Sequence, residues 1–199
     1  AHAHIFDEFR GQSARGPVRG VGYGRAAIGD GEFQLIPPFN ERTCHTAETM
    51  VRMLDWAGVD QAVLLQGPFY GDQNDVVLRA LDAHPTRFRG AAYFDPWLPG
   101  AREHFERVIA PDRRFCAVKL EISASYGLCS LHPGARLDEA ELNWLWAALA
   151  ERQLTLAFDL GGINSASYQT TAVRRIAELQ PELRIVIAHL GQVNRAAEV

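Results

Sequence analysis

The run Phe115-Cys116-Ala117-Val118-Lys119-Leu120-Glu121-Ile122 is short and almost continuously apolar. Such a run is typical of a strand in a parallel sheet that is covered on both faces. Five further stretches resemble it in length and composition, namely residues 1–6, 59–65, 90–94, 154–158 and 184–188. The sequence therefore predicts six strands.

Helical patterns separate these runs. Thr46 suits the N-cap of a helix that ends near Gly58. Three more N-caps are predicted at Asp72, Asp138 and Ser167, and a further helix is predicted over residues 99–109. Regular alternation of strand and helix predicts a parallel sheet with right-handed crossovers.

An open doubly wound sheet and a closed barrel both have this alternation. The Gly-rich phosphate-binding fingerprint of dinucleotide folds does not follow the first strand. We therefore expect an α/β fold of the TIM-type (β/α)8 barrel, with about six βα units in residues 1–199. A closed barrel has eight strands, so the last two βα units are expected to lie beyond Val199. The 199 residues then form a single, partial barrel domain.

Composition restricts the partners. A net charge of −4 argues against nucleic acid or an anionic membrane as the main partner, since both attract basic surfaces. The sequence holds no run near the roughly 18 apolar residues of a membrane helix. It has three cysteines and no CxxC pair, so a disulfide framework is not expected. We expect a cytoplasmic protein whose partner is a small-molecule substrate.

Residues 9–45 form a long stretch after the first strand without a clear strand or helix pattern. Long loops of this kind are usually functional or disordered. Barrels build their active sites at the carboxyl ends of their strands, so we interpret the stretch as a pocket wall or lid. Disorder is the alternative for residues 10–31, and the glycine-rich residues 20–24 are expected to be a flexible loop.

His2 and His4 are the first candidate functional residues. Two positions apart on a strand, their imidazoles share one face. Neighbouring buried imidazoles need partners for four ring nitrogens, and a divalent metal is the usual partner. The alternatives are a pair of hydrogen-bonded structural histidines and a cloning remnant.

Charged residues on later strands add to this site. His189 follows the apolar run 185–188, at a strand end where barrel active sites lie. Lys119 and Glu121 share one strand face, and charged groups rarely occupy such positions without a role. Glu121 is a candidate metal ligand and Lys119 a candidate substrate contact, the alternative being a buried ion pair between them.

Asp159 ends the run 154–158 and is a candidate general base or metal ligand, or else the cap of the turn at Gly161. His45 is a candidate substrate contact from the long segment, and His132 a weaker one. Asp95, which precedes a proline, is expected to be a turn residue.

These motifs in order resemble the amidohydrolase superfamily, specifically its amidohydrolase-2 group of metal-dependent barrel hydrolases and decarboxylases. The resemblance covers the whole chain and rests on His2-Ala3-His4, on residues 53–60, on Val118-Lys119-Leu120-Glu121 and on residues 181–191. It implies that His2 and His4 bind a metal and that His189 binds metal or substrate. The family also has a histidine at the end of its fifth strand, where this chain has Asp159, and an eighth-strand aspartate that lies outside residues 1–199.

The resemblance implies a reaction in which zinc or a similar ion activates water or holds a carboxylate. We expect a hydrolase acting on C–O or C–N bonds, or a decarboxylase, with a small carboxylated or cyclic substrate. His189 and Asp159 are the expected catalytic residues. The rival within the family is a metal-free lactonase, which Asp159 in place of the histidine favours.

Two rivals come from other classes. A TatD-type deoxyribonuclease also opens with an HxH motif, but the sequence shows no basic groove. A non-catalytic barrel scaffold is consistent with a chain that lacks two βα units. Because an incomplete barrel exposes sheet edges, we also expect this chain to form homo-oligomers or aggregates.

Overall fold

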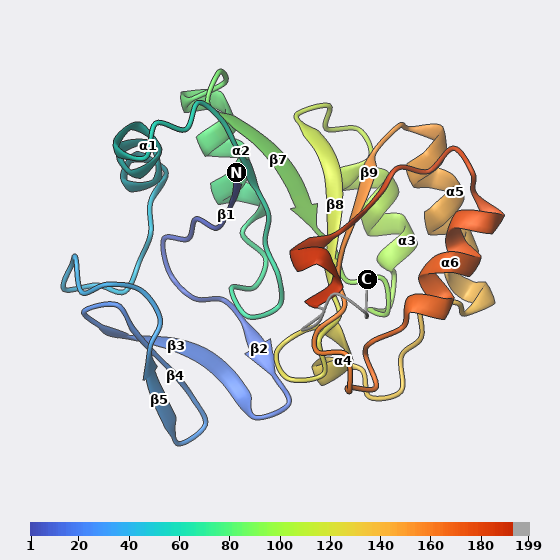
Figure 1. Cartoon of the computed structure of the whole chain (residues 1–199), viewed down its shortest axis with the longest axis horizontal. Coiled ribbons are helices and arrows are strands. Elements are labelled where there is room, and N and C mark those ends of the chain that lie inside the picture. The colour runs from blue at the N-terminus through green and yellow to red at the C-terminus, as the bar shows by residue number, and fades with distance from the viewer. Residues whose placement is uncertain (193–199) are drawn as a thin grey trace. The chain divides into compact units, whose positions relative to one another are not determined.

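The computed structural model describes residues 1–192, which form two compact units, residues 1–93 and the part of the chain from Phe94 onward. Figure 1 labels most of their helices and strands. Each unit carries three strands of the parallel kind that the sequence predicts. The prediction that residues 1–199 form one domain stays a prediction.

The first unit contains the parallel strands β1 (His2–Ala3), β6 (Ala62–Leu64) and β7 (Phe88–Tyr93). His2 pairs with Val63, and Ala62 pairs with Phe88. Helix α1 (Ala47–Trp56) precedes β6, and helix α2 (Asn74–Ala83) connects β6 to β7. Strand β1 is shorter than the predicted strand over residues 1–6, because beyond Ala3 only Phe6 pairs again, in an isolated antiparallel bridge to His45.

A second, antiparallel sheet in this unit corrects the interpretation of residues 9–45. Its strands are β2 (Gln12–Ser13), β3 (Gly16–Gly22), β4 (Arg25–Ile28) and β5 (Gly31–Gln34). Residues 20–24 are therefore the end of β3 and a tight turn rather than a flexible loop. Tyr23 and Gly24 adopt positive φ angles of 49° and 75° there, and the turn glycine tolerates this backbone.

The second unit contains the parallel strands β8 (Phe115–Glu121), β9 (Thr155–Asp159) and β10 (Ile185–Ile187). Between them lie the helices α4 (Leu128–Leu131), α5 (Asn143–Glu151) and α6 (Thr170–Leu179), with a 3-10 turn at Ala140–Leu142. Helix α3 (Ala101–His104) continues into a π-helical turn at Phe105–Ile109. Together they correspond to the helix predicted over residues 99–109. The last described turn is a 3-10 segment at Ala188–Gln192.

The helix starts differ from the prediction in three cases. Thr46 caps α1 as expected, and its side chain accepts a hydrogen bond from the N–H of Thr49. Asp72, Asp138 and Ser167 are not N-caps, since the caps of α2, α5 and α6 are Gln73, Leu142 and Gln169. Asp138 pairs instead with Arg136 and Arg175, and the hydroxyl of Ser167 donates to the carbonyl of Leu160.

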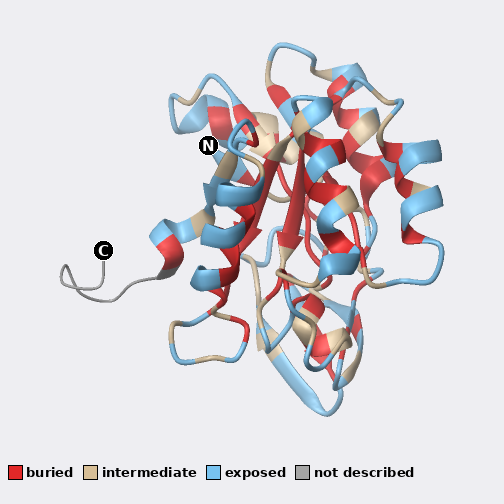
Figure 2. Cartoon of the chain, turned by 90° about the vertical axis from the view of Figure 1, so that its right-hand side faces the viewer, coloured by how far each residue is buried: buried red, intermediate tan, exposed pale blue. Residues whose placement is uncertain are grey.

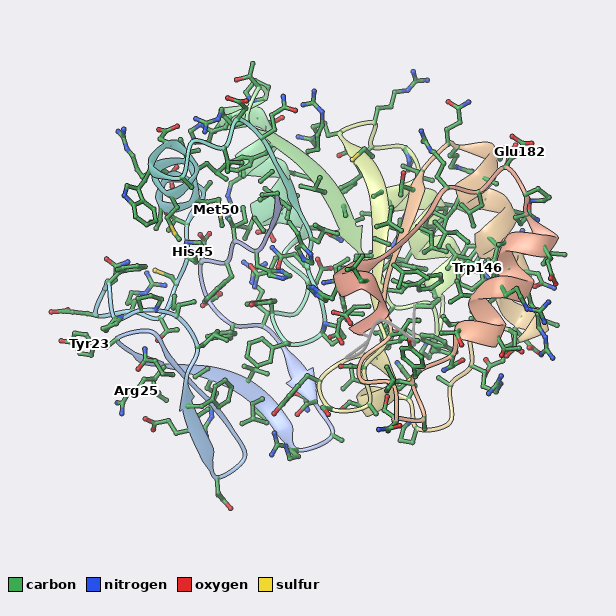
Figure 3. All side chains as sticks on the ribbon, viewed as in Figure 1. Tyr23, Arg25, His45, Met50, Trp146 and Glu182 are labelled. Atoms are coloured by element: carbon green, nitrogen blue, oxygen red, sulfur yellow. The ribbon has the colours of Figure 1, made fainter. Side chains whose placement is uncertain are left out.

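The core of each unit lies between its parallel strands and its helices. Figure 2 shows buried residues along the central parallel strands, while the helices present exposed residues on their outer faces. In the second unit, Trp146 of α5 is fully buried, with its ring centroid 6.2 Å from that of Phe158 on β9. Figure 3 labels this tryptophan among the side chains of α5. Over the described residues, no helix has both the length and the apolar character needed to cross a membrane.

Candidate active site

Four predicted residues of the second unit lie at the carboxyl ends of neighbouring strands. Glu121 ends β8 and Asp159 ends β9, and these two residues are direct partners in the register of the two strands. His189 follows β10, and its Nε2 lies 3.3 Å from Oδ2 of Asp159. Lys119 lies two residues before Glu121 and interacts electrostatically with both carboxylates. The functional residues predicted at the ends of these strands thus form one cluster of charges. We call it the strand-end cluster, and its members are Lys119, Glu121, Asp159 and His189.

Lys119 is the buried cation of this cluster. Its side chain is almost fully buried, and burial lowers the pKa of its amine, while the attraction of Glu121 and Asp159 opposes that shift. Lys119 is also the single lysine of the chain, whose other basic residues besides histidine are all arginines. An amine can lose its proton when buried, whereas a guanidinium stays charged. The use of lysine at this one position is a sequence signal of function that the pattern of strands does not reveal.

Glu121 is held in place by the loop that follows β8. Burial raises the pKa of its carboxyl, Asp159 adds to that shift, and the hydrogen bond with Ser123 and the charge of Lys119 oppose it. Oε1 of Glu121 accepts the N–H of Ser123 at 3.1 Å. Gly127 makes this arrangement possible, because a Cβ atom there would lie 2.6 Å from Oε1 of Glu121 and 2.3 Å from the nitrogen of Ser123.

His189 reaches Asp159 through an unusual backbone. Residues His189, Leu190 and Gly191 have φ angles of 56°, 51° and 68°. Non-glycine residues rarely adopt this left-handed conformation, and strain of this kind gathers at functional sites. β10 itself ends at Ile187, two residues before His189 rather than next to it as predicted.

The charges of this cluster predict a pH-dependent loss of stability in Lys119→Met. Removing the ammonium leaves Glu121 facing Asp159, which raises the folded-state pKa of Glu121 further above its usual value of 4.5. A carboxyl with a raised folded pKa contributes stability below its unfolded pKa and loses that contribution as the pH rises through its folded pKa. The lowered pKa of Lys119 has an effect of the same sign. The wild type loses stability as the pH falls through the folded-state pKa of Lys119, and the Lys119→Met variant lacks this loss.

Urea unfolding should therefore show that Lys119→Met lowers the free energy of unfolding more at about pH 8 than at about pH 5, by about 1 kcal/mol or more. Arg175→Met, which removes an exposed cation paired with Asp138, is the matched control and should show no such trend. An equal effect of Lys119→Met at both pH values would contradict the coupling between Lys119 and Glu121.

His2 and His4 lie in the first unit and share a face as predicted. Their ring centroids are 4.8 Å apart, while the intervening Ala3 is buried. Nδ1 of His4 is 2.5 Å from the carbonyl oxygen of Leu65, and its ring stacks on Tyr70. A backbone carbonyl bonded to one ring nitrogen fixes the tautomer that leaves the other nitrogen as a metal ligand.

His45 supports His4 from within the first unit, and its predicted contact with substrate stays a prediction. It is buried, its Nδ1 is 3.0 Å from the carbonyl oxygen of His4, and its Nε2 is 3.2 Å from Sδ of Met53. Both ring nitrogens are thus used inside the protein. His45 (labelled in Figure 3) fixes the backbone of His4 from the segment that precedes α1.

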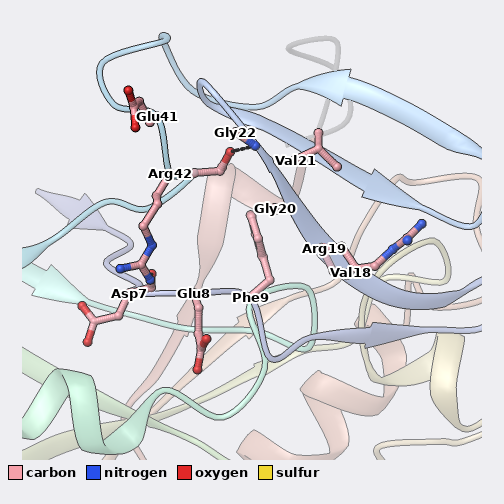
Figure 4. A pocket seen from close by; sticks show the side chains of 11 residues that line it. Asp7, Glu8, Phe9, Val18, Arg19, Gly20, Val21, Gly22, Glu41 and Arg42 are labelled. Carbon is pink, nitrogen blue, oxygen red and sulfur yellow. Dashed lines mark hydrogen bonds between the residues drawn. The ribbon is translucent and has the colours of Figure 1, made fainter.

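The segment after β1 lines a pocket of about 600 Å³ within the first unit. Figure 4 shows Asp7, Glu8 and Phe9 on one wall and β3 on another, with Arg42 between them. The guanidinium of Arg42 donates to the backbone carbonyl of Asp7 at 3.3 Å. The ring of Phe9 stacks on Tyr70, the residue against which His4 packs. The interpretation of residues 9–45 as a pocket wall agrees with this lining.

Sequence reasoning missed a histidine–carboxylate pair in the second unit. Nε2 of His132, at the end of α4, lies 2.8 Å from Oδ2 of Asp95, which is buried. Asp95 is a turn residue as predicted, since its Oδ1 accepts the N–H of Trp97. Its pairing with a residue 37 positions away has no local sequence pattern, so only the fold brings it to light.

The donors present fit a divalent metal only in part. Two imidazoles on one strand face, one with its tautomer fixed by a carbonyl, have the chemistry of metal ligands. Within residues 1–192, however, no group of three or more His, Cys, Asp or Glu side chains is arranged to hold a metal ion. The predicted ligand set of His2, His4, Glu121 and His189 therefore stays a prediction.

Solved structures with a similar fold are TIM-barrel proteins. One is an uncharacterised TIM-barrel protein from Bordetella bronchiseptica (17% identity, TM-score 0.57, 73% of this chain and 51% of that chain). Another is a probable 2-pyrone-4,6-dicarboxylic acid hydrolase from Acinetobacter baumannii with citric acid bound (16%, 0.59, 96% and 58%). A third is a 5-carboxyvanillate decarboxylase from Novosphingobium aromaticivorans complexed with manganese and 4-hydroxy-3-methoxy-5-nitrobenzoic acid (20%, 0.53, 71% and 49%).

At these identities the likeness establishes the fold alone, and it confirms the predicted barrel class. The chain spans about half the length of these three solved structures, from 49% to 58%. No curated protein matches it. The family model described as Amidohydrolase matches residues 1–198. Because that model covers nearly the whole sequence, the chain belongs to the amidohydrolase family, as its strand motifs predicted.

Proposed function

We propose that this chain carries catalytic residues of a metal-dependent hydrolase or decarboxylase that acts on a small cyclic carboxylic acid. The observation that carries the proposal is the strand-end cluster, in which a buried lysine faces two carboxylates and one of these contacts a histidine. Such a set can bind an acid group and move a proton, and perturbed titratable groups of this kind cluster at functional sites. The family match and the two solved barrels named for cyclic carboxylic acids support the same class.

In this proposal each residue has its own role. His2 and His4 hold the metal, which when bound polarises a substrate oxygen or lowers the pKa of water. The ammonium of Lys119 binds a substrate carboxylate, because it is a compact charge in a dry environment. Asp159 and His189 hold and move the proton, and Glu121 keeps Lys119 charged or serves as a further metal ligand.

Metal binding separates this proposal from the metal-free lactonase of the same family. The lactonase is favoured by Asp159, which stands where the family has a histidine. We expect purified protein to bind Mn²⁺ or Zn²⁺ stoichiometrically in isothermal titration. The double variant His2→Ala/His4→Ala should weaken binding by more than the roughly 10- to 100-fold that the loss of an outer-shell partner costs.

His104→Ala, which removes a histidine on α3, is the control and should bind metal like the wild type. Activity is measured with lactones and aromatic acids that carry carboxylates, by acid release for hydrolysis and by carbon dioxide release for decarboxylation. Turnover that survives complete chelation, without metal binding, would replace the metal-dependent enzyme by the lactonase.

A further inference from the structure

The carboxylate of Asp95 and the imidazole of His132 form a pair in which the carboxylate is buried. Asp95 is only 5% exposed, and both of its carboxylate oxygens are used. Oδ1 accepts the backbone N–H of Trp97 at 3.1 Å, and Oδ2 lies 2.8 Å from Nε2 of His132. A buried carboxylate is costly unless its charge is compensated. The side chain that Oδ2 contacts is the imidazole of His132, so the two residues form a pair.

The carboxylate fixes which nitrogen of His132 carries the proton. An ionised aspartate only accepts hydrogen bonds, so Nε2 must donate, and in the neutral ring Nδ1 is then an acceptor. Within residues 1–192, Nδ1 of His132 has no hydrogen-bond partner, and its side chain is 25% exposed. The partly exposed ring therefore carries, at Nδ1, an acceptor nitrogen of defined tautomer.

Neighbouring side chains hold the ring from a second direction. The ring of Trp97 lies over His132 with centroids 5.9 Å apart. The indole N–H of Trp97 donates to Oε2 of Glu139 at 3.2 Å, and Oε1 of Glu139 accepts the N–H of Arg136. The position of His132 is thus fixed by the carboxylate of Asp95 and by the ring of Trp97, which Glu139 holds in turn.

The pair belongs to the same region of the second unit as the strand-end cluster. His132 follows α4, in the connection that begins directly after Glu121. Oε1 of Glu121 accepts the N–H of Ser123, and the carbonyl of Ser123 accepts the N–H of Gly127, the residue that caps α4. At the other end of α4 the N–H of His132 donates to the carbonyl of Leu128, so backbone hydrogen bonds connect Glu121 to His132 through this short helix.

We propose that His132 is a proton-transfer residue of this active site, acting through Nδ1, and that Asp95 is its positioning residue. The inference rests on the proposed function. In the transfer, the lone pair of Nδ1 takes a proton from a substrate hydroxyl or from the attacking water, and the oxygen keeps the electron pair. The imidazolium is stabilised by the carboxylate of Asp95, and Nδ1 later returns the proton to the leaving oxygen.

The structure makes Asp95→Asn a specific test. The N–H of Trp97 needs an acceptor at Oδ1, so the asparagine oxygen stays there and its NH₂ group takes the place of Oδ2. The NH₂ group donates, so Nε2 of His132 must accept, and the proton moves to Nδ1. We expect nitrogen-15 NMR of His132 to show the Nε2–H tautomer in the wild type and the Nδ1–H tautomer in Asp95→Asn.

The same variant should lower kcat/KM by about 10²- to 10⁴-fold, the usual contribution of general acid–base catalysis. His132→Gln provides a second route, since its amide can still donate to Asp95 but cannot take a proton, and it should lose as much activity. Asp138→Asn, which alters a carboxylate paired with Arg136 and Arg175, should leave activity unchanged.

The outcomes separate the two proposals. An active wild type with equally active Asp95→Asn and His132→Gln variants would overturn the role of His132 and leave the proposed function standing. An Nδ1–H tautomer in the wild type would overturn the role of Asp95. A wild type that turns over none of the cyclic carboxylic acids, even with metal added, would overturn both proposals.

Discussion

Asp159→Asn should lower kcat/KM by about 10²- to 10⁴-fold while the protein stays folded. Asp159 ends β9, and its Oδ2 lies 3.3 Å from Nε2 of His189. Its Oδ1 accepts the N–H of Gly161 at 3.2 Å, a bond that the asparagine oxygen can keep. The substitution therefore preserves the turn after β9 and removes the charge that faces His189 and Lys119.

The backbone around Gly161 is the reason that we expect the Asp159→Asn variant to fold like the wild type. Gly161 has a φ of 72°, and a Cβ atom there would lie 2.9 Å from Cβ of Ser123. The turn is thus held by its glycine and by the hydrogen bond to Oδ1, which the asparagine can keep. Circular dichroism and the unfolding midpoint should match the wild type, with Asp138→Asn as the control for loss of a carboxylate elsewhere. Activity within about twofold of the wild type would remove Asp159 from the mechanism.

The parallel strands could be predicted because burial on both faces leaves a visible mark in the sequence. Runs such as residues 115–122 and 154–158 have few polar residues, and they correspond to β8 and β9 within one or two positions. The antiparallel sheet of residues 12–34 left no such mark. Its strands are short, rich in glycine and arginine, and mostly exposed on one face, so their composition resembles that of a loop.

The helix caps show a second limit of sequence reasoning. Asp138 has the right side chain for a cap, but the fold places Arg175 beside it, 37 residues along the chain. An ion pair of that separation competes with capping and has no local pattern. Thr46, by contrast, has no such partner among the described contacts and caps α1 as its sequence context predicts.

The residues of the candidate site also fall into two groups, those that sequence patterns predict and those that only the fold reveals. Lys119 and Glu121 could be assigned to one strand face because strands have a period of two residues. Asp159 and His189 could be assigned because strand ends are where barrels place chemistry. The supporting place of His45 and the pairing of Asp95 with His132 depend on contacts between residues 41 and 37 positions apart. Side chains that act through such contacts are found only when the fold is known.

Trp146→Ala should lower the free energy of unfolding by about 3–5 kcal/mol, the usual cost of removing a fully buried large aromatic side chain. Trp146 is 0% exposed and packs edge-to-face on Phe158 of β9, so its loss opens a cavity between α5 and the strand that carries Asp159. Urea unfolding measures the effect. Trp56→Ala is the matched control, because Trp56 is 88% exposed and surface substitutions usually change stability by less than about 0.5 kcal/mol.

Trp146→Phe then separates volume from polarity at the same position. Within residues 1–192, the indole Nε1 of Trp146 is buried and has no hydrogen-bond partner. An unsatisfied buried donor costs about 1–3 kcal/mol, and phenylalanine removes that donor while it keeps most of the ring. We therefore expect Trp146→Phe to lie within about 1.5 kcal/mol of the wild type, because it leaves a smaller cavity than alanine and removes the unsatisfied donor. A loss as large as that of Trp146→Ala would mean that the indole N–H does have a partner, and a loss below about 1 kcal/mol in Trp146→Ala would mean that α5 does not pack on β9 in solution.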